Sequence, residues 1–574
     1  MNRRNFWRSA NFLVATTIFL LGWLITGCRQ NVVLESGVAP TVSPLMGSRE
    51  TEDESGMDST DAPDPVPTLQ DKSALSDSQV NELENFQVAV DVNKDVHPIS
   101  PLIYGLSGGF KEHEEQLRFT LNSWGGNPST RFNWQLGNAW NAGSDWYYIN
   151  GNYGYTGQSA SDDFISDANQ AGIAVRLAIP TLGWVAKNDD NNTCSFPMPD
   201  GTCGDADGAN CQNPGEIADP TLANVPSDPE FIRGWLEHLF LEKEFDIRFI
   251  AMDNEPMLWG STHYDVHPDC TTYEEVLEKF LTYAEVVREV APEVEITGPN
   301  SCCWYYYWNS AAGQGDVLRH KNQPFLAWFL EQVREHDQVT GQRTLDVLDI
   351  HYYPDGLYNN VVDEETASHR LRSTRSLWDP QYLDESWIDE PVELIPKMKG
   401  LIDRFYPGTK LGISEWNWGA DGTMNGALAI ADVLGIFGRE ELYFAAYWRE
   451  PPINSPGFYA FKMFTNVDNE GQRFGDTSVW SETTNYDQVS SYAALDSETG
   501  NLHLMLVNKV PEDSFPIEVN LNGLEIKPDV TLHQYSENNL TDIVKDALEV
   551  SQTGNFTLSL PPNSITLLII TPNS

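Results

Sequence analysis

Two glutamates close apolar stretches of the sequence. Glu255 ends the run "RFIAMDNE", and Glu415 ends the run "KLGISE". Hydrolysis of a glycosidic bond uses two carboxyl groups, one protonated to assist the leaving oxygen and the other ionised. Taken singly, each glutamate is as well explained as a turn or surface carboxylate. Taken together, each beside proline or aromatic residues, they predict a glycosidase site.

The elements around these glutamates alternate in type. Short apolar runs indicate buried strands, and the longer segments between them have apolar residues at helical spacing. The strand-like runs include "GIAVRLAIP", "FDIRFIAMDNEP", "VEITGPN", "LDVLDIHYYP", "KLGISEWNWG" and "LYFAAYW". This alternation predicts an α/β fold, a (β/α)8 TIM-like barrel, over residues 101–482. Active sites of such barrels form where the strands end, which is where both glutamates fall.

The end of the chain has a different pattern. Residues 483–574 contain strand-like runs such as "NLHLMLVNK" and "SITLLIITP", separated by Gly, Asn and Pro, without a helical pattern of note. They predict an attached all-β sandwich domain. The alternating run "FQVAVDV" lies outside the barrel pattern, so residues 86–100 are expected to add an N-terminal strand to that sandwich.

Residues 1–28 have the pattern of a lipoprotein signal peptide. Three arginines precede an apolar stretch that is too short for an ordinary spanning helix, and "LITGC" resembles a bacterial lipobox. We expect lipidation at Cys28; the alternative is an uncleaved N-terminal anchor with an incidental Cys28. Residues 29–85, rich in Ser, Thr, Pro and acidic residues, predict a disordered linker. The protein is expected to be exported and lipid-anchored at the cell envelope or cell surface.

Charge restricts the possible partners. The formal net charge is −49, and an acidic surface of this size repels nucleic acid, anionic lipid headgroups and polyuronates. A neutral partner is therefore favoured, with no membrane contact beyond the lipid anchor, and the chain is expected to be a monomer. Exposed rings among the 18 Trp are good platforms for the apolar faces of sugars, although most such rings are packed in cores.

Cysteines and one acidic loop raise the question of disulfides and ions. Of seven cysteines, six remain when Cys28 is set aside, and in an oxidising compartment they suggest up to three disulfides of open connectivity. Zinc is less favoured because the first three of these six contain no CxxC pair. In "DGTCGDADGANC", Asp205 and Asp207 are candidate ligands for a structural calcium. The loop lacks the full calcium motif, so a solvated, disulfide-pinned insertion is the alternative.

Several longer motifs carry a resemblance to a known family. The stretches "WGGNPSTRFNWQLGNAWNAGSDWYY", "DNEPMLWGSTHYDVHP", "DIHYYP", "RLRSTRSLWDPQYLDESWI" and "SEWNWGA" are similar, in this order, to those of glycoside hydrolase family 44. The resemblance extends over most of residues 88–574. It implies a barrel with a β-sandwich, retaining cleavage within β-1,4-glucan or xyloglucan chains, a neutral β-glucan partner and no required cofactor. It also implies that Glu255 is the general acid/base and Glu415 the nucleophile.

Two positions depart from the pattern of that family. Ser123 stands where an arginine is expected, two places before Gly-Gly, and this affects the contacts of that loop. Trp416 and Trp418 stand where tyrosines are common, a change expected to alter stacking more than chemistry.

The other candidates for substrate binding lie at or near strand ends. Asn254 is placed to donate a hydrogen bond to the sugar hydroxyl beside the reacting carbon, and Tyr353 to donate one to the nucleophile. Asn127 and Arg131 follow a Gly-Gly turn and orient the substrate or the acid, or else bond to loop carbonyls. The remaining candidates, for which packed rings are the alternative, are Trp124, Trp134, Trp259, His351, Trp416 and Trp448.

This chemistry near neutral pH requires a raised pKa at Glu255 while Glu415 stays ionised. Two alternative functions remain open at the level of sequence. One is a hemicellulase, a xylanase or mannanase of a related barrel type that uses the same glutamates. The other is a non-catalytic glycan-binding surface lipoprotein.

Overall fold

The computed structural model describes residues 86–573, except residue 110 and residues 154–158, 512–513 and 552–553. These residues belong to one compact unit, Asn85–Ser574. The predicted signal peptide, the linker at residues 29–85 and Cys28 lie outside the described residues. Within the part that is described, no helix is both long enough and apolar enough to cross a membrane.

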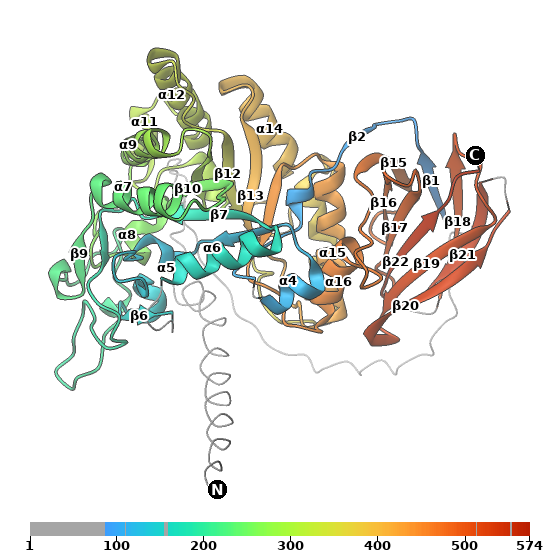
Figure 1. Cartoon of the computed structure of the whole chain (residues 1–574), viewed down its shortest axis with the longest axis horizontal. Coiled ribbons are helices and arrows are strands. Elements are labelled where there is room, and N and C mark those ends of the chain that lie inside the picture. The colour runs from blue at the N-terminus through green and yellow to red at the C-terminus, as the bar shows by residue number, and fades with distance from the viewer. Residues whose placement is uncertain (1–85, 110, 154–158, 512–513, 552–553, 574) are drawn as a thin grey trace, which may run out of the picture. The chain divides into compact units, whose positions relative to one another are not determined.

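Eight parallel strands close into a barrel (Figure 1). In chain order they are β3 (Gly105–Ser107), β4 (Leu121–Trp124), β7 (Ala174–Ile179), β10 (Phe249–Met252), β11 (Glu295–Ser301), β12 (Val347–Tyr352), β13 (Lys410–Trp416) and β14 (Phe444–Tyr447). Each strand pairs with the next, and β14 pairs with β3 to complete the ring. The predicted (β/α)8 architecture is confirmed.

Helices connect the strands of the barrel. The longer ones are α4 (Lys111–Leu117), α6 (Ala160–Ala171), α7 (Pro229–Glu237), α9 (Tyr273–Val290), α12 (Phe325–Thr340), α13 (Glu364–Arg372), α14 (Leu394–Phe405), α15 (Met424–Arg439) and α16 (Pro456–Thr465). Their ends follow local chemistry: the Thr272 side chain accepts a hydrogen bond from the Glu275 amide and starts α9. Gly172, with φ of 70°, ends α6.

The lower part of the barrel interior is apolar. Leu121, Phe249, Val347 and Phe444 each begin one of four alternate strands, and together they form a fully buried cluster. Such a layer, supplied by every second strand, is how barrels of this type fill their centre. Gly412 makes room for it, because a Cβ at that position would lie 2.4 Å from the Phe444 ring.

The C-terminal domain is one hydrogen-bonded, largely antiparallel sheet. Its strands are β1 (Gln87–Asp91), β2 (His97–Pro98), β15 (Thr477–Thr483), β16 (Val489–Leu495), β17 (Leu502–Asn508), β18 (Phe515–Asn522), β19 (Asp529–Ser536), β20 (Asn539–Glu549), β21 (Asn555–Leu560) and β22 (Ser564–Ile570). The start of β15 pairs with β16 and its end pairs with β1, so this strand joins two halves of the sheet. The predicted β domain is therefore present, with its halves continuous through β15.

The N-terminal strand is part of this C-terminal sheet. β1 lies between β15 and β18, antiparallel to the first and parallel to the second. The strands of this sheet that follow the barrel begin at Thr477, a few residues before the boundary that the sequence pattern suggested at residue 483.

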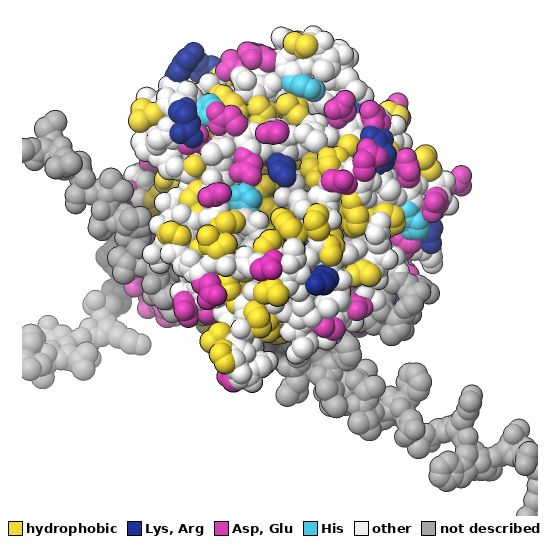
Figure 2. All heavy atoms as spheres, turned by 90° about the vertical axis from the view of Figure 1, so that its left-hand side faces the viewer, with side chains coloured by type: hydrophobic (Ala, Val, Ile, Leu, Met, Phe, Trp, Pro, Cys, Tyr) yellow, Lys and Arg dark blue, Asp and Glu magenta, His cyan; other side chains and the backbone are white. Residues whose placement is uncertain are grey.

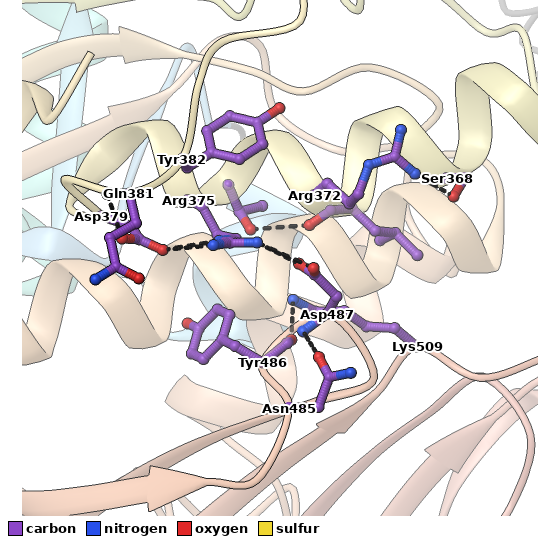
Figure 3. A network of polar contacts seen from close by, with 12 residues as sticks. Ser368, Arg372, Arg375, Asp379, Gln381, Tyr382, Asn485, Tyr486, Asp487 and Lys509 are labelled. Carbon is purple, nitrogen blue, oxygen red and sulfur yellow. Dashed lines mark hydrogen bonds and ion pairs between the residues drawn. The ribbon is translucent and has the colours of Figure 1, made fainter. Parts of the chain in front are cut away.

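A polar network joins the barrel to the sheet domain (Figure 3). Arg375, in the turn after α13, pairs with Asp379 and with Asp487, which lies between β15 and β16. Deeper in the junction, Asp432 of α15 and Lys509 at the end of β17 form an ion pair of 2.8 Å whose side chains are at most 1% exposed. The sheet domain is thus bonded to the barrel through buried as well as surface charges.

Short hairpins and disulfides stabilise the loops above the barrel. The hairpins pair β5 (Ala139–Asn141) with β6 (Asn150–Asn152), and β8 (Trp184–Ala186) with β9 (Asn224–Pro226). Disulfides join Cys194 to Cys203 and Cys211 to Cys270. Among the described residues these are the two disulfides that the structure contains, and Cys302 and Cys303 are not bonded to another cysteine in it.

Candidate active site

Glu255 is presented by a tight turn that follows β10. Its backbone is in the left-handed region, with φ of 44°, a conformation that costs energy for a side chain with a Cβ. The buried Asp253 holds this turn: its carboxylate accepts hydrogen bonds from the amides of Thr181, Leu182 and Asn254 at 2.5–3.1 Å. The strained turn therefore presents Glu255 at the barrel mouth. Asp253, which the sequence motif did not single out, supports this turn.

Glu415 lies near the end of β13, and two residues of the neighbouring β12 segment hold it. Tyr353 Oη donates to Glu415 Oε2 at 2.9 Å. His351 stands directly beside Glu415 in the sheet register, and its Nδ1 lies 3.4 Å from Glu415 Oε2. The same nitrogen lies 2.8 Å from Glu255 Oε1. One imidazole therefore bridges the two carboxylates.

The two carboxyl groups face each other at close range. Carboxylate oxygens of Glu255 and Glu415, and a ring nitrogen of His351, all lie within 4.8 Å of one another. Glycosidases that retain anomeric configuration have carboxyl groups about 5–5.5 Å apart, whereas inverting enzymes need room for a water between theirs. The separation here fits a direct attack on the sugar.

The pKa values in this cluster are shifted by burial and by charge. Burial and the charge of Glu255 raise the pKa of Glu415 to about 7, although His351, Tyr353 and Arg176 act to lower it. Burial lowers the pKa of His351, but the charges of both glutamates and the hydrogen bond to Glu255 outweigh it and raise that pKa. The raised pKa of Glu415 departs from the expectation that this group stays fully ionised near neutral pH. Glu415, only 7% exposed, is the deeper of the two groups.

A buried polar layer supports the site from below, and the sequence pattern did not reveal it. Arg176 of β7 pairs with Asp349 of β12 at 2.8 Å and donates to Ser123 Oγ and to Asn300. This arginine also lowers the pKa of Glu415. Ser123, which stands where an arginine was expected, therefore accepts a bond from an arginine on the next strand. The sequence did contain a signal for this ion pair, because Arg176 and Asp349 are charged residues within the otherwise apolar runs "AVRLAI" and "VLDIHY".

A chain of amides leads away from the acid. Asn254 Nδ2 donates to Asn127 Oδ1 at 2.9 Å, and Asn127 Nδ2 donates to Asp145 at 2.6 Å. Burial, with a smaller contribution from Glu255, raises the pKa of Asp145 to about 6. Asn127 thus orients Asn254, the residue directly before Glu255, and Asp145 was not foreseen.

Most of the predicted aromatic platforms are core residues. Trp259 and Trp416 are at most 1% exposed, and Trp416 packs among Trp418, Phe437 and Tyr447. Trp124 is packed against Phe132, Tyr153 and Phe164. Their assignment to substrate binding is wrong, because rings so enclosed cannot cover a sugar.

Two other tryptophans remain partly exposed. Trp448 lies across the Gly-Gly turn, where a Cβ on Gly126 would come within 2.3 Å of its ring. Gly125, the residue before Gly126, faces Glu415 Oε1, so Trp448 lies beside the cluster of Glu255, His351 and Glu415. Trp134 instead donates to the Phe231 carbonyl of α7, away from that cluster.

Arg131 is an internal residue rather than a substrate ligand. Its side chain is 0% exposed and pairs with Asp265 at 2.6 Å, with further bonds to Asn141 and Asn224. It binds loop side chains, not the carbonyls that the alternative interpretation suggested. The predicted role in orienting substrate is therefore wrong.

Two clusters have the residue types of a metal site. One is Glu255, His351 and Glu415, whose oxygens already accept from Tyr353 and the imidazole. The other is Glu274, Asp316 and His320, in which Asp316 accepts from Ser310 and Arg319. Asp205 and Asp207 are exposed and belong to neither cluster, so calcium in that loop stays a prediction.

An eight-stranded barrel with two facing carboxylates at its strand ends defines a glycoside hydrolase. Comparison with known proteins agrees: residues 139–356 match glycoside hydrolase family 44. The chain is 34% identical to CelM2, a bifunctional glucanase-xylanase from a metagenome library, covering 85% of this chain and 99% of that one, with a TM-score of 0.81. The chain belongs to glycoside hydrolase family 44.

Other relatives are more distant. A Paenibacillus polymyxa xyloglucanase of family 44 is 26% identical, with 85% of this chain and 99% of that chain covered and a TM-score of 0.75. Beta-mannanase/endoglucanase A of Caldicellulosiruptor saccharolyticus is 28% identical over 524 residues, which are 83% of this chain. The match spans only 38% of the length of that protein.

Proposed function

We propose that the protein is a retaining, endo-acting β-1,4-glucanase in which Glu255 is the general acid/base and Glu415 the nucleophile. The observation that carries this proposal is the approach of the two carboxyl groups to within 4.8 Å around His351. A glycan-binding protein without activity has no need of two buried carboxylates at this distance. The intact pair therefore argues against the non-catalytic alternative.

The first step transfers the glycosyl group to the protein. Glu255 gives its proton to the leaving glycosidic oxygen while Glu415 attacks the anomeric carbon, so that the glycosidic bond breaks as the Glu415 ester forms. Tyr353 and His351 hold Oε2 of Glu415, which leaves Oε1 to attack. Because the pKa of Glu415 is raised to about 7, this group is partly protonated in the free protein at neutral pH. A leaving oxygen bound beside Glu255 favours transfer of that proton to Glu255.

The second step releases the sugar. Once Glu415 is esterified its charge is gone, and Glu255 then accepts a proton from water. The water oxygen attacks the same carbon as the ester bond breaks, which returns Glu415 as a carboxylate. His351 stays hydrogen-bonded to Glu255 through both steps and keeps the carboxylate oriented. Two displacements at one carbon restore its original configuration.

A neutral β-glucan, plain or as xyloglucan, is the proposed substrate. The face of the barrel that points away from the sheet domain carries many acidic and few basic side chains, with hydrophobic side chains between them (Figure 2). Such a surface disfavours polyanions. The names of the related glucanase-xylanase and xyloglucanase support a β-1,4-linked backbone. Because CelM2 is named for both activities, xylan is the second candidate substrate.

The roles of the two glutamates are separable by experiment. With an aryl cellobioside whose leaving group needs no proton, Glu255→Gln should still release aryl alcohol in a first burst, and Glu415→Gln should not. The exposed Glu525→Gln is the matched control and should behave as wild type. NMR of the first products on xyloglucan, carboxymethylcellulose, xylan and mannan should show retention; inversion would refute the covalent step.

We further propose that the protein is exported and anchored by lipid at Cys28. The support is the sequence pattern of residues 1–28. Metabolic labelling with a fatty-acid analogue should mark the wild type and not Cys28→Ala. Label that persists in the variant would refute lipidation at this residue.

A further inference from the structure

Two adjacent cysteines lie beside the catalytic cluster and take no part in the proposed chemistry. Cys302 follows directly after β11, and Cys303 precedes α10 (Trp304–Trp308). Cys302 is 4% exposed and Cys303 is half-buried. Their sulfurs lie 2.7 Å apart. Non-bonded carbon atoms rest about 3.5–4.0 Å apart, and sulfur is larger than carbon, so the side chains already converge as in a covalent pair.

We propose that Cys302 and Cys303 form a vicinal disulfide in the mature protein. The chain already contains two disulfides, Cys194–Cys203 and Cys211–Cys270, so it fits a compartment that oxidises thiols. The two sulfurs already lie within 2.7 Å of each other, so little further approach is needed for a bond. No other described cysteine is free to compete for either of them.

The bond forms by thiol–disulfide exchange with an external disulfide, small-molecule or protein. The more exposed Cys303 attacks as thiolate, forms a mixed disulfide and releases one external thiol. Cys302 then loses its proton and attacks Cys303 Sγ, which closes the ring and releases the second external thiol. Two cysteine thiols are oxidised and one external disulfide is reduced to two thiols.

The pair lies between two anchors of the catalytic cluster. Upstream, Asn300 Nδ2 donates to the carbonyl of Asp253 at 2.6 Å and so holds the turn that presents Glu255. Downstream, Tyr307 of α10 donates its hydroxyl hydrogen bond to the carbonyl of His351. A covalent ring at 302–303 fixes the junction from which both anchors extend.

A vicinal disulfide is also more easily reduced than the other two. Adjacent Cα atoms are about 3.8 Å apart, less than the 4.4–6.8 Å that ordinary disulfides span. The ring is correspondingly strained, and strained disulfides are the labile ones. Cys302–Cys303 should therefore open first when reductant is added.

Thiol mapping tests the bond without reference to activity. The protein is purified without reductant, unfolded in guanidinium with N-ethylmaleimide and digested. We expect the peptide containing residues 302 and 303 to be unalkylated and lighter than the dithiol by two hydrogen atoms. Alkylation of both cysteines would overturn the proposal. In a reductant titration followed by alkylation, opening of either of the other two disulfides before this one would overturn its lability.

The expected effect of this disulfide on catalysis rests on the proposed function and is measured separately, through kcat and its pH dependence. Mild reduction should lower kcat on the order of tenfold and move the pH profile in wild type, because the anchors of Glu255 and His351 shift. Cys302→Ser/Cys303→Ser should show no response to the reductant. An unchanged profile in wild type with an opened ring would refute the coupling and leave the mapped bond in place. If the double variant does not fold, mapping and reduction of wild type still decide both points.

Discussion

At the scale of residues, the site is a small set of charges whose balance depends on one imidazole. His351 touches both carboxylates and lowers the pKa of Glu415, while burial and Glu255 raise it. The protonation of Glu415 at neutral pH is therefore set by its neighbours as well as by its burial.

Replacing His351 should therefore shift the pH dependence of activity. In His351→Gln the pKa of Glu415 rises above about 7, since a group that lowers it is gone. Because Glu415 must be ionised to attack, the acid limb of kcat/KM should move to higher pH, and kcat should fall. The measurement is kcat/KM across pH 4–9, with His97→Gln in the sheet domain as control. An acid limb that stays in place would show that His351 does not tune the nucleophile.

Asp253 should be as important as a residue that touches substrate. In Asp253→Asn an NH2 group replaces one carboxylate oxygen. In the wild type the backbone amides donate to the carboxylate, so the NH2 group would face other donors and the turn that presents Glu255 must move. We expect kcat to fall on the order of a hundredfold with little change in KM, and stability to fall by about 2 kcal/mol. Asp219→Asn, an exposed aspartate that bonds the amide of Thr221, is the matched control. Equal activity of the two variants would contradict this role.

The sequence allowed some of this site to be predicted and not the rest. The positions of Glu255 and Glu415 and the hydrogen bond from Tyr353 to Glu415 follow from which residues end apolar runs. The contacts of His351 with both glutamates were not foreseen, because His351 was assigned to substrate binding. Trp124, Trp259 and Trp416 were misassigned, because the type of an aromatic residue does not tell which side of a strand end it faces. Arg176 and Asp349 were missed because a buried ion pair joins strands that are far apart in sequence.

At the scale of elements, the barrel and the sheet domain are held together by the contacts of α15. This helix packs against β16 and β17, and its Asp432 receives bonds from Lys509, Thr374 and Tyr492. Burial alone would raise the pKa of Asp432, but Lys509 and the hydroxyls hold it below its usual value. The contribution of this charge to stability is therefore present above pH 4 and is lost as the pH falls through the lowered pKa.

Breaking this junction should cost far more than breaking a surface pair. Lys509→Met leaves the buried Asp432 without a cation, and we expect a loss of about 3–5 kcal/mol in the free energy of unfolding. Lys509→Met/Asp432→Leu should recover most of it. Arg372→Gln, which removes the exposed pair with Glu385, is the control and should cost at most about 1 kcal/mol. Urea unfolding measures all three; a Lys509→Met variant as stable as the control would contradict the assignment.

At the scale of the whole molecule, acid stability should be limited by a histidine in the sheet. His503 of β17 is 0% exposed, and burial lowers its pKa to about 4. Between the ordinary value of 6.5 and this value, the unfolded chain binds a proton that the folded chain does not. Stability from this group is thus complete above about pH 6.5 and declines as the pH falls towards 4.

Comparison of wild type with His503→Gln isolates this effect. Between pH 7 and pH 4 the wild type should lose about 3 kcal/mol more of its unfolding free energy than the variant does. The variant is therefore relatively more stable in acid. The measurement is urea unfolding at several pH values. A difference independent of pH would mean that His503 has the same pKa in the folded and unfolded chain.

The place of β1 has a consequence for how the chain is made. Synthesis delivers residues 87–91 before the barrel exists, yet both partner strands of β1 come from residues after 476. This first strand of the described residues therefore lacks its partner strands until nearly all of the chain has been translated. If translation pauses within the barrel sequence, β1 is left with unpaired backbone hydrogen-bonding groups, which can pair with another chain. Slow translation or export therefore favours aggregation through residues 87–91.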